Sequence, residues 1–290
     1  MRITDGGMET TLIFKQGLDL PHFAAFVLLD DPEGVEALRA YYGSYIEIAE
    51  KHGVGIVLDT PTWRANADWG GKLGYGAEAL ADVNRRAVAL LEELRTPEVL
   101  VSGCVGPRGD GYQVGEEMTA DEAERYHGPQ IETFSATSAD LVSALTLTYA
   151  AEATGIVRAA GETPVVVSFT VETDGRLPSG QPLGEGIEQV DAETDGAADF
   201  FMVNCAHPTH FVDVLEPAPW LDRLHGVRAN ASQKSHAELD EAQELDEGDP
   251  NELAARYREL RDRLPNLSVV GGCCGTDHRH VEAIARAVTP

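Results

Sequence analysis

The sequence has few basic residues and no long apolar run. Lys and Arg total 22 against 49 Asp and Glu among 290 residues, so the formal net charge is −27. A surface this acidic repels phosphate backbones and anionic lipid, which argues against nucleic-acid and membrane partners. No segment has the length of a membrane span, and the opening "MRITDGGMET" contains no apolar stretch of signal-peptide length. We therefore expect a cytoplasmic protein.

Cysteine is also scarce. The four cysteines, Cys104, Cys205, Cys273 and Cys274, are too few and too unevenly spaced for the disulfide framework of a secreted domain. In a reducing compartment they are expected to be thiols, and a cysteine cluster there more often indicates a metal or a catalytic site.

Short apolar segments alternate with longer helical patterns along the whole chain. The alternation predicts a (β/α)8 barrel formed by residues 1–290 as a single domain. A doubly wound open sheet would require a Gly-x-Gly-x-x-Gly loop after the first strand, and "DGGMET" does not have that spacing. The acidic stretch at 235–250 is interpreted as a solvated loop insert. The expected strands are 2–7, 53–60, 98–106, 139–146, 163–170, 199–205, 224–230 and 267–274, and the expected helices are 34–51, 78–95, 119–135, 149–160, 250–264 and 277–288.

The carboxyl ends of barrel strands face the active-site mouth, so the residues at these ends are the candidate site. Cys205 ends the sixth expected strand, and Cys273 and Cys274 end the eighth, only two strand–helix units later. Their sulfurs are therefore expected to lie close together. The other strand-end candidates are Asp5, Gly6, Gly7, Asp59, Thr62, Cys104, Thr146, Thr170, Glu172, Asn204 and Asn230.

Several interpretations of the cysteines remain open at this point. Cys104 is expected to be a small buried apolar residue. The vicinal pair Cys273–Cys274 could be packed thiols, a strained disulfide, or two ligands of a metal that Cys205 completes, with nearby glycines loosening the backbone. Zinc suits thiolates, and a catalytic zinc keeps three protein ligands and one open position. A structural zinc would need a fourth ligand and usually Cys-x-x-Cys knuckles, which are absent.

The histidines near these cysteines offer a rival site. His207, His210, His278 and His280 have spacings that could bind a metal and activate water, as in a barrel hydrolase. The alternative is that they are solvated residues at helix starts, with Thr276 capping the last helix.

An open site with three thiolates favours one kind of chemistry. Three thiolates on Zn²⁺ give a formal charge of about −1, so the metal activates water weakly. An incoming thiol suits it better, because binding lowers the thiol pKa and a thiolate forms at neutral pH. The expected reaction is alkyl transfer to that sulfur by in-line displacement.

The cysteines stand in the segments "VNC" (203–205) and "GGCCGT" (271–276), and the chain also contains "DGGMETTL", "TPTWRAN", "VSGCVGPRGDGY" and "VSFTVETDGRLPSG". Together these segments resemble the homocysteine S-methyltransferase family, which includes betaine– and S-methylmethionine–homocysteine methyltransferases. It implies a (β/α)8 barrel, a zinc ion on Cys205, Cys273 and Cys274, and transfer of a methyl group to homocysteine in methionine biosynthesis. It also implies that Asp5, Gly6, Thr62 and Asn204 bind substrate.

Two residues depart from the family pattern. The family commonly carries a glutamate for the substrate's ammonium group at the position of Leu145, and Glu9 stands where another residue type is usual. A buried ammonium without a partner costs on the order of 1–3 kcal/mol. Either another acid (Glu172, Asp5 or Glu9) replaces the lost carboxylate, or the acceptor is a different thiol.

Three hypotheses follow: a zinc-dependent thiol methyltransferase, a histidine–metal barrel hydrolase, and a non-catalytic zinc or redox-sensing protein. The first alone explains three cysteines at two strand ends. Its partners would be a small thiol and a sulfonium or ammonium methyl donor, which Trp63, Trp69 or Tyr112 could contact. The sequence leaves open whether the protein forms a homo-oligomer.

Overall fold

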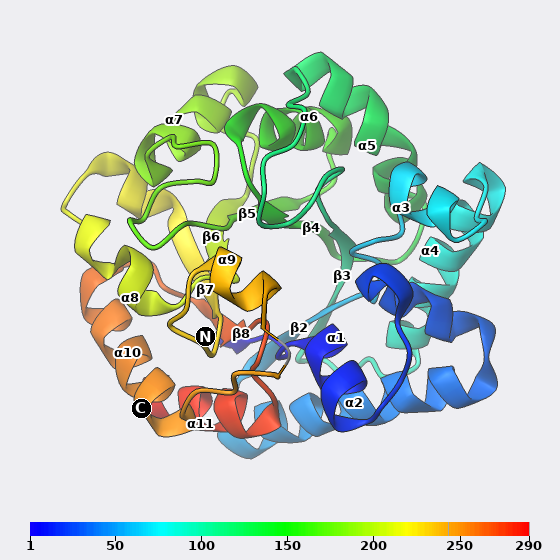
Figure 1. The fold of residues 1–290 in the computed structure, drawn as a ribbon, viewed down its shortest axis with the longest axis horizontal. Coiled ribbons are helices and arrows are strands. Elements are labelled where there is room, and N and C mark those ends of the chain that lie inside the picture. Colours follow the sequence, from blue (N-terminus) through cyan, green and yellow to red (C-terminus); the bar gives the residue numbers. More distant parts are fainter. Residues whose placement is uncertain (243, 290) are drawn as a thin grey trace.

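The computed structural model describes residues 1–242 and 244–289. Eight parallel strands pair in chain order and β8 pairs with β1, which closes the barrel and confirms the predicted fold (Figure 1). The strands are β1 (Arg2–Ile3), β2 (Gly55–Asp59), β3 (Val99–Val105), β4 (Leu141–Leu147), β5 (Val165–Phe169), β6 (Phe200–Asn204), β7 (Leu224–Ala229) and β8 (Val269–Gly272).

One helix follows each strand and packs on the outside of the barrel. These helices are α2 (Pro32–His52), α4 (Ala77–Glu92), α5 (Ala120–Ser135), α6 (Ala150–Ala160), α7 (Leu183–Thr194), α8 (Pro208–Phe211), α10 (Pro250–Arg263) and α11 (His278–Val288). The sequence patterns predicted all of them except α7, although for α8 only a helix start near His207 and His210 was expected. Three further short helices, α1 (Met8–Thr10), α3 (Ala67–Lys72) and α9 (His236–Asp240), lie in loops.

The helix ends follow local sequence signals. Asp31 accepts a hydrogen bond from Gly34 N–H at the start of α2, and Gly53 ends the helix with a φ of 63°. At the start of α5, Thr119 and Glu122 form a reciprocal capping box. Such caps fix where each helix begins and therefore where the preceding loop returns to the barrel.

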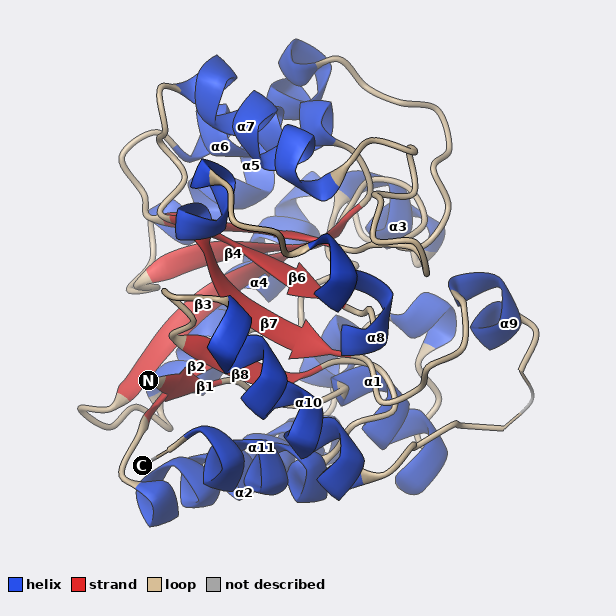
Figure 2. Cartoon of the chain, turned by 90° about the vertical axis from the view of Figure 1, so that its left-hand side faces the viewer, coloured by secondary structure: helices blue, strands red, loops and turns tan. Residues whose placement is uncertain are grey.

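The amino-terminal half of the barrel interior is filled by apolar side chains. A cluster of buried residues from five different strands can form only inside the ring, and it comprises Val57, Leu141, Val166, Met202 and Val269. With this end closed, the polar residues gather at the opposite mouth. Figure 2 shows that the strands point toward the side where α1 and α9 lie, away from both termini.

The described part of the chain contains no helix that is both long and apolar enough to cross a membrane.

Tyr257 of α10 connects the outer layer to the ends of β7 and β8. Its hydroxyl accepts a hydrogen bond from Ala229 N–H at 2.9 Å and lies 2.5 Å from Gly271 O.

We expect Tyr257→Phe to destabilise the protein by about 1–3 kcal/mol, because Ala229 N–H would stay buried without a partner. Urea unfolding would measure the change. The control is Tyr75→Phe, because the Tyr75 hydroxyl is exposed, and its free energy of unfolding should stay within about 0.5 kcal/mol of the wild-type value. Equal changes in the two variants would contradict the prediction.

Candidate active site

The three cysteines predicted to converge do so at the barrel mouth. Cys205 directly follows β6, and Cys273 and Cys274 directly follow β8. The Cys205 Sγ lies 2.7 Å from Cys273 Sγ and 3.4 Å from Cys274 Sγ, and all three sulfurs lie within 4.8 Å of one another. All four cysteines are free, so the vicinal pair forms no disulfide. Cys104 is buried outside the cluster, as predicted.

The backbone of β7 holds both cysteine segments in place. Cys205 N–H donates to Arg228 O at 3.0 Å, and Cys273 N–H donates to Ala229 O at 2.8 Å. Two residues beyond the end of β7, Ala231 N–H donates to Cys274 O at 3.1 Å. The main chain after β6 and the main chain after β8 are therefore fixed to the same strand end, and the sulfurs meet across it.

The glycines around the vicinal pair serve close packing more than flexibility. A Cβ at Gly271 would collide with Thr4, and one at Gly272 would collide with Thr276. Only Gly275 has the left-handed backbone that glycine favours, with a φ of 78°. The prediction that Gly271, Gly272 and Gly275 all loosen the backbone around the vicinal pair is thus correct only for Gly275.

Asn204 supports an unusual backbone at the mouth. Cys205 has a φ of 56° and Thr146, at the end of β4, has a φ of 64°, which is rare for a β-branched residue. The Asn204 side chain accepts from Thr146 N–H at 2.8 Å and from Ser168 Oγ at 2.7 Å, and it donates to Thr146 Oγ1 at 2.8 Å. These bonds connect three strand ends and offset the strain of about 1–3 kcal/mol that such residues carry.

Tyr112 and His236 cover the cysteine cluster. The Tyr112 hydroxyl lies 3.2 Å from Cys205 Sγ, and its ring stacks on His236 with centroids 4.1 Å apart. His236 Nε2 lies 3.0 Å from Cys205 O, and Nδ1 lies 3.1 Å from Glu172 Oε1. Burial and the neighbouring thiols raise the pKa of Tyr112 well above its ordinary value, so the phenol stays protonated. The contact with His236 Nδ1 means that the Glu172 carboxylate already has a partner within the protein.

A buried arginine neutralises the acids below the cluster. The Arg228 guanidinium pairs with the carboxylates of Asp5 and Asp59, and its Nε donates to Gly272 O at 3.2 Å. Tyr41 also donates to Asp5, at 3.1 Å. Burial raises the pKa of Asp5 to about 7, and the positive charge of Arg228 opposes that rise. Both carboxylates have a cationic partner within the protein.

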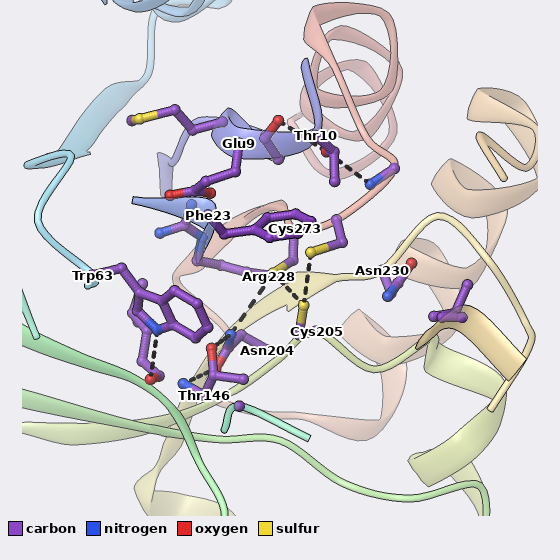
Figure 3. A pocket seen from close by; sticks show the side chains of 18 of the residues that line it. Glu9, Thr10, Phe23, Trp63, Thr146, Asn204, Cys205, Arg228, Asn230 and Cys273 are labelled. Carbon is purple, nitrogen blue, oxygen red and sulfur yellow. Dashed lines mark hydrogen bonds between the residues drawn. The ribbon is translucent and has the colours of Figure 1, made fainter. Parts of the chain in front are cut away.

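A cavity of about 450 Å³ opens onto the sulfurs at the mouth (Figure 3). Asp5, Gly6 and Asn204 line it, as the predicted substrate-binding residues should. Thr62 does not: it is fully buried and its hydroxyl donates to Cys104 O at 2.8 Å, and Thr60 lines the cavity instead. Among the three aromatic candidates, Trp63 and Tyr112 line the cavity, whereas the Trp69 ring lies outside it between Arg64 and Lys72.

The acidic stretch after β7 also reaches the cavity. Leu239, Ala242 and Leu245 line the cavity together with Asp240 and Asp246. Figure 2 places α9 beyond the ends of the strands, on the side of the mouth. The prediction of a solvated insert is therefore incomplete, because the apolar residues of the stretch form one wall of the cavity; Gln243 lies outside the described residues.

The histidines do not form the rival metal site. His207, His210 and His280 are buried, and only His278 is exposed as predicted. Each buried ring has a local partner: His207 caps α8 through Thr209 N–H, and His210 Nε2 lies 2.9 Å from Gln233 O. The cap of α11 is Asp277, which forms a capping box with His280, and not Thr276. Among the described residues, the only group arranged to hold a metal is the three cysteines.

Sequence reasoning missed Arg228 and His236. Arg228 is a charged residue inside the otherwise apolar segment "LHGVRA" of β7, and such a buried charge requires acidic partners nearby. A charged residue inside an apolar strand segment could therefore have identified Arg228 from the sequence alone. His236 lies in the acidic stretch 235–250, where no local pattern indicates that its ring stacks on Tyr112.

The fold and this cluster define a barrel enzyme whose chemistry is centred on sulfur. The family model for homocysteine S-methyltransferase matches residues 2–288, so the chain belongs to the homocysteine S-methyltransferase family. Membership confirms the predicted family and the predicted enzyme class, methyl transfer.

Curated relatives and solved structures agree with this assignment. The chain is 24% identical to homocysteine S-methyltransferase 4 of Zea mays, over 99% of this chain and 89% of the relative. It is 22% identical to homocysteine S-methyltransferase YbgG of Bacillus subtilis (strain 168), over 98% and 93%. The metallated form of the homocysteine methyltransferase MmuM from Escherichia coli has a TM-score of 0.75 at 20% identity, over 99% of this chain and 96% of that one. At this identity the structural match supports the fold.

The Arg228 pairings predict a large stability effect. In Arg228→Met two buried carboxylates lose their cation, so we expect the free energy of unfolding to fall by about 3–5 kcal/mol. Arg85→Met is the matched control, since its pairing with Asp82 is half exposed, and it should stay within about 0.5 kcal/mol. Urea denaturation at pH 7 measures both. An Arg228 variant as stable as the control would show that the buried pairs are not needed.

Proposed function

We propose that this protein is a zinc-dependent S-methyltransferase that moves a methyl group from a sulfonium or ammonium donor to a thiol, by default homocysteine to give methionine. The observation that carries the proposal is the convergence of the Cys205, Cys273 and Cys274 sulfurs at the floor of an open cavity. The metal ligands would be these three cysteines, and the substrate contacts would include Asp5, Gly6 and Asn204.

The cysteine cluster fits a zinc ion. Thiolates at about 2.3 Å from one tetrahedral ion lie roughly 3.8 Å apart. The sulfurs of Cys205 and Cys274, 3.4 Å apart, are near that spacing, whereas those of Cys205 and Cys273, 2.7 Å apart, would have to separate by about 1 Å to bind the same ion. Hydrogen bonds with Cys205 and Cys274 lower the pKa of Cys273 well below its ordinary value, so one sulfur of the cluster already favours the thiolate. The fourth side of the cluster faces the cavity, where an acceptor thiol would enter. A zinc ion held here would lower the pKa of that thiol and keep its sulfur nucleophilic at neutral pH.

The residues around the cluster would position the acceptor and exclude water. Asn204 holds the strained backbone of Thr146, and the bond from Cys205 N–H to Arg228 O holds Cys205 at the cavity. Tyr112 and His236 cover one side of the cluster and shield it from solvent. In the transfer step, the acceptor sulfur forms a bond to the methyl carbon while the bond between that carbon and the donor breaks. The electron pair of the broken bond stays on the donor, which leaves as a neutral thioether or amine.

The outer part of the cavity favours a cationic donor. The carboxylates Asp110, Asp240, Glu244 and Asp246 line it. Arg64 lies over the Trp63 ring, with its guanidinium carbon 4.0 Å from the ring centroid, and His236 stacks on Tyr112, so a methylated cation would meet the opposite faces of these rings. This combination supports a sulfonium or ammonium donor over an anionic one.

Zinc content tests the metal site. The wild-type protein should hold about one zinc ion per chain, and Cys273→Ser should lose it, since two thiolates hold zinc far more weakly than three. Mass spectrometry of the dialysed proteins would measure the metal. Cys104→Ser, which changes a buried thiol outside the cluster, is the control and should keep its zinc. Unchanged zinc in Cys273→Ser, or loss of zinc in His207→Ala, would contradict the assignment.

Product detection tests the reaction. We expect the zinc-loaded protein to convert homocysteine to methionine with at least one of S-methylmethionine, S-adenosylmethionine and betaine, as measured by the mass of the thioether. Transfer should be lost in Cys273→Ser and retained in Glu241→Gln, which changes an exposed acid outside the cavity wall. Zinc binding without methylation of any thiol in a broad panel would instead indicate a non-catalytic zinc or redox-sensing protein.

A further inference from the structure

An α-amino thiol brings an ammonium group into the cavity, and a desolvated ammonium needs a carboxylate partner. Leu145 cannot supply one, because its apolar side chain forms part of the cavity wall and is only 7% exposed. The acid that receives this group must therefore come from elsewhere on the wall, and the structure allows the candidates to be compared.

Two of the three candidate acids are already occupied. Asp5 is paired with Arg228 and accepts a hydrogen bond from Tyr41. Glu172 is paired with His236 and does not line the cavity. An ammonium group could reach either carboxylate only by displacing a cation or a histidine that the fold holds in place.

The acids at the rim are occupied or exposed. Asp110 accepts from Tyr112 N–H at 2.8 Å, and Asp246 accepts from Ser232 Oγ at 2.8 Å. Asp240 accepts from Gln113 Nε2 at 3.3 Å. Glu244 is exposed, so water would screen any contact that it makes.

Glu9 differs from all of these. It lies in α1, and among the described residues no side chain donates a hydrogen bond to its carboxylate and no cation pairs with it within 4 Å. Figure 3 shows its side chain extending into the same cavity as Trp63 and the cysteines. Glu9 is half-buried, and the burial of its carboxyl group raises its pKa to about 7; the hydrogen bond from its own backbone N–H and the positive charge of Arg228 oppose that rise only in part.

The backbone around Glu9 is anchored to the cysteine turn. Thr10 Oγ1 accepts a hydrogen bond from Gly275 N–H at 3.2 Å and donates to Gly7 O at 3.1 Å. Gly7 N–H in turn donates to Thr276 O at 3.1 Å. The backbone that carries Glu9 is therefore held against the turn of Cys273 and Cys274, as a specificity contact requires.

We propose that Glu9 is the specificity-determining residue that receives the ammonium group of an α-amino thiol acceptor. This inference rests on the proposed thiol methyltransferase function and specifies which side chain binds the ammonium group of the acceptor. The residue that binds the amino group then lies in α1, which follows β1, and not at the end of β4.

A pair of thiols that differ only in the amino group tests the inference. Homocysteine and 4-mercaptobutyrate have the same chain length, thiol and carboxylate. In zinc-loaded Glu9→Gln we expect the KM for homocysteine to rise about tenfold or more, because a charged contact is lost, with kcat little changed. The KM for 4-mercaptobutyrate should stay within about twofold. Glu9→Asp, which keeps the charge, should recover part of the loss, and Glu241→Gln, an exposed acid outside the cavity wall, is the control.

The outcomes distinguish a failure of the Glu9 inference from a failure of the proposed methyltransferase function. Equal effects of Glu9→Gln on both thiols, no effect on either, or an amine-specific loss in Glu244→Gln instead would overturn the inference while methyl transfer stands. The same follows if the wild type methylates 4-mercaptobutyrate and ignores homocysteine. A wild-type protein that methylates neither thiol with any donor would overturn the proposed function itself.

Discussion

The candidate site depends on the hydrogen bonds that join the end of β7 to the segments on both of its sides. Because β7 lies between β6 and β8, closure of the barrel leaves one strand between Cys205 and the vicinal pair. The carbonyls of Arg228 and Ala229 each accept one N–H from a cysteine. The main chain that carries the three sulfurs is therefore positioned by strand pairing on both sides of β7.

The same strand also carries the charge on which the cavity floor depends. Arg228 lies at the end of β7, directly below the cysteines, and its guanidinium neutralises both Asp5 and Asp59. A protein already carrying a net charge of −27 gains from this pairing, since two uncompensated carboxylates beside three thiols would repel one another strongly. The consequence for binding is that two of the acids nearest the sulfurs are not available to an incoming cation.

The sequence predicted the barrel and the cysteine cluster because both follow from rules that act along the chain. Apolar strands alternating with amphipathic helices specify a closed parallel sheet, and strand ends of such a sheet face one mouth. Contacts that depend on side-chain direction were not accessible in this way. Thr62 was expected in the cavity but its hydroxyl bonds to the barrel wall at Cys104 O, and the buried rings of His207, His210 and His280 were expected in solvent. Thr60 and Thr62 both lie beyond the end of β2, where the regular alternation of strand side chains no longer predicts which of them faces the cavity.

Strain and satisfied polar groups are distributed unevenly around the mouth, and this asymmetry bears on function. On the β4–β6 side, the Asn204 side chain holds the positive φ of Thr146, and Cys205 N–H is bonded to Arg228 O, so that side is rigid and its polar groups are used internally. On the β1 side, Glu9 lies on a wall whose backbone is anchored, and among the described residues no other side chain donates a hydrogen bond to its half-buried carboxylate. A rigid side suits the positioning of a nucleophilic sulfur, where small displacements are costly. A half-buried carboxylate without a paired cation on the other side suits recognition, because a ligand of opposite charge compensates its partial desolvation.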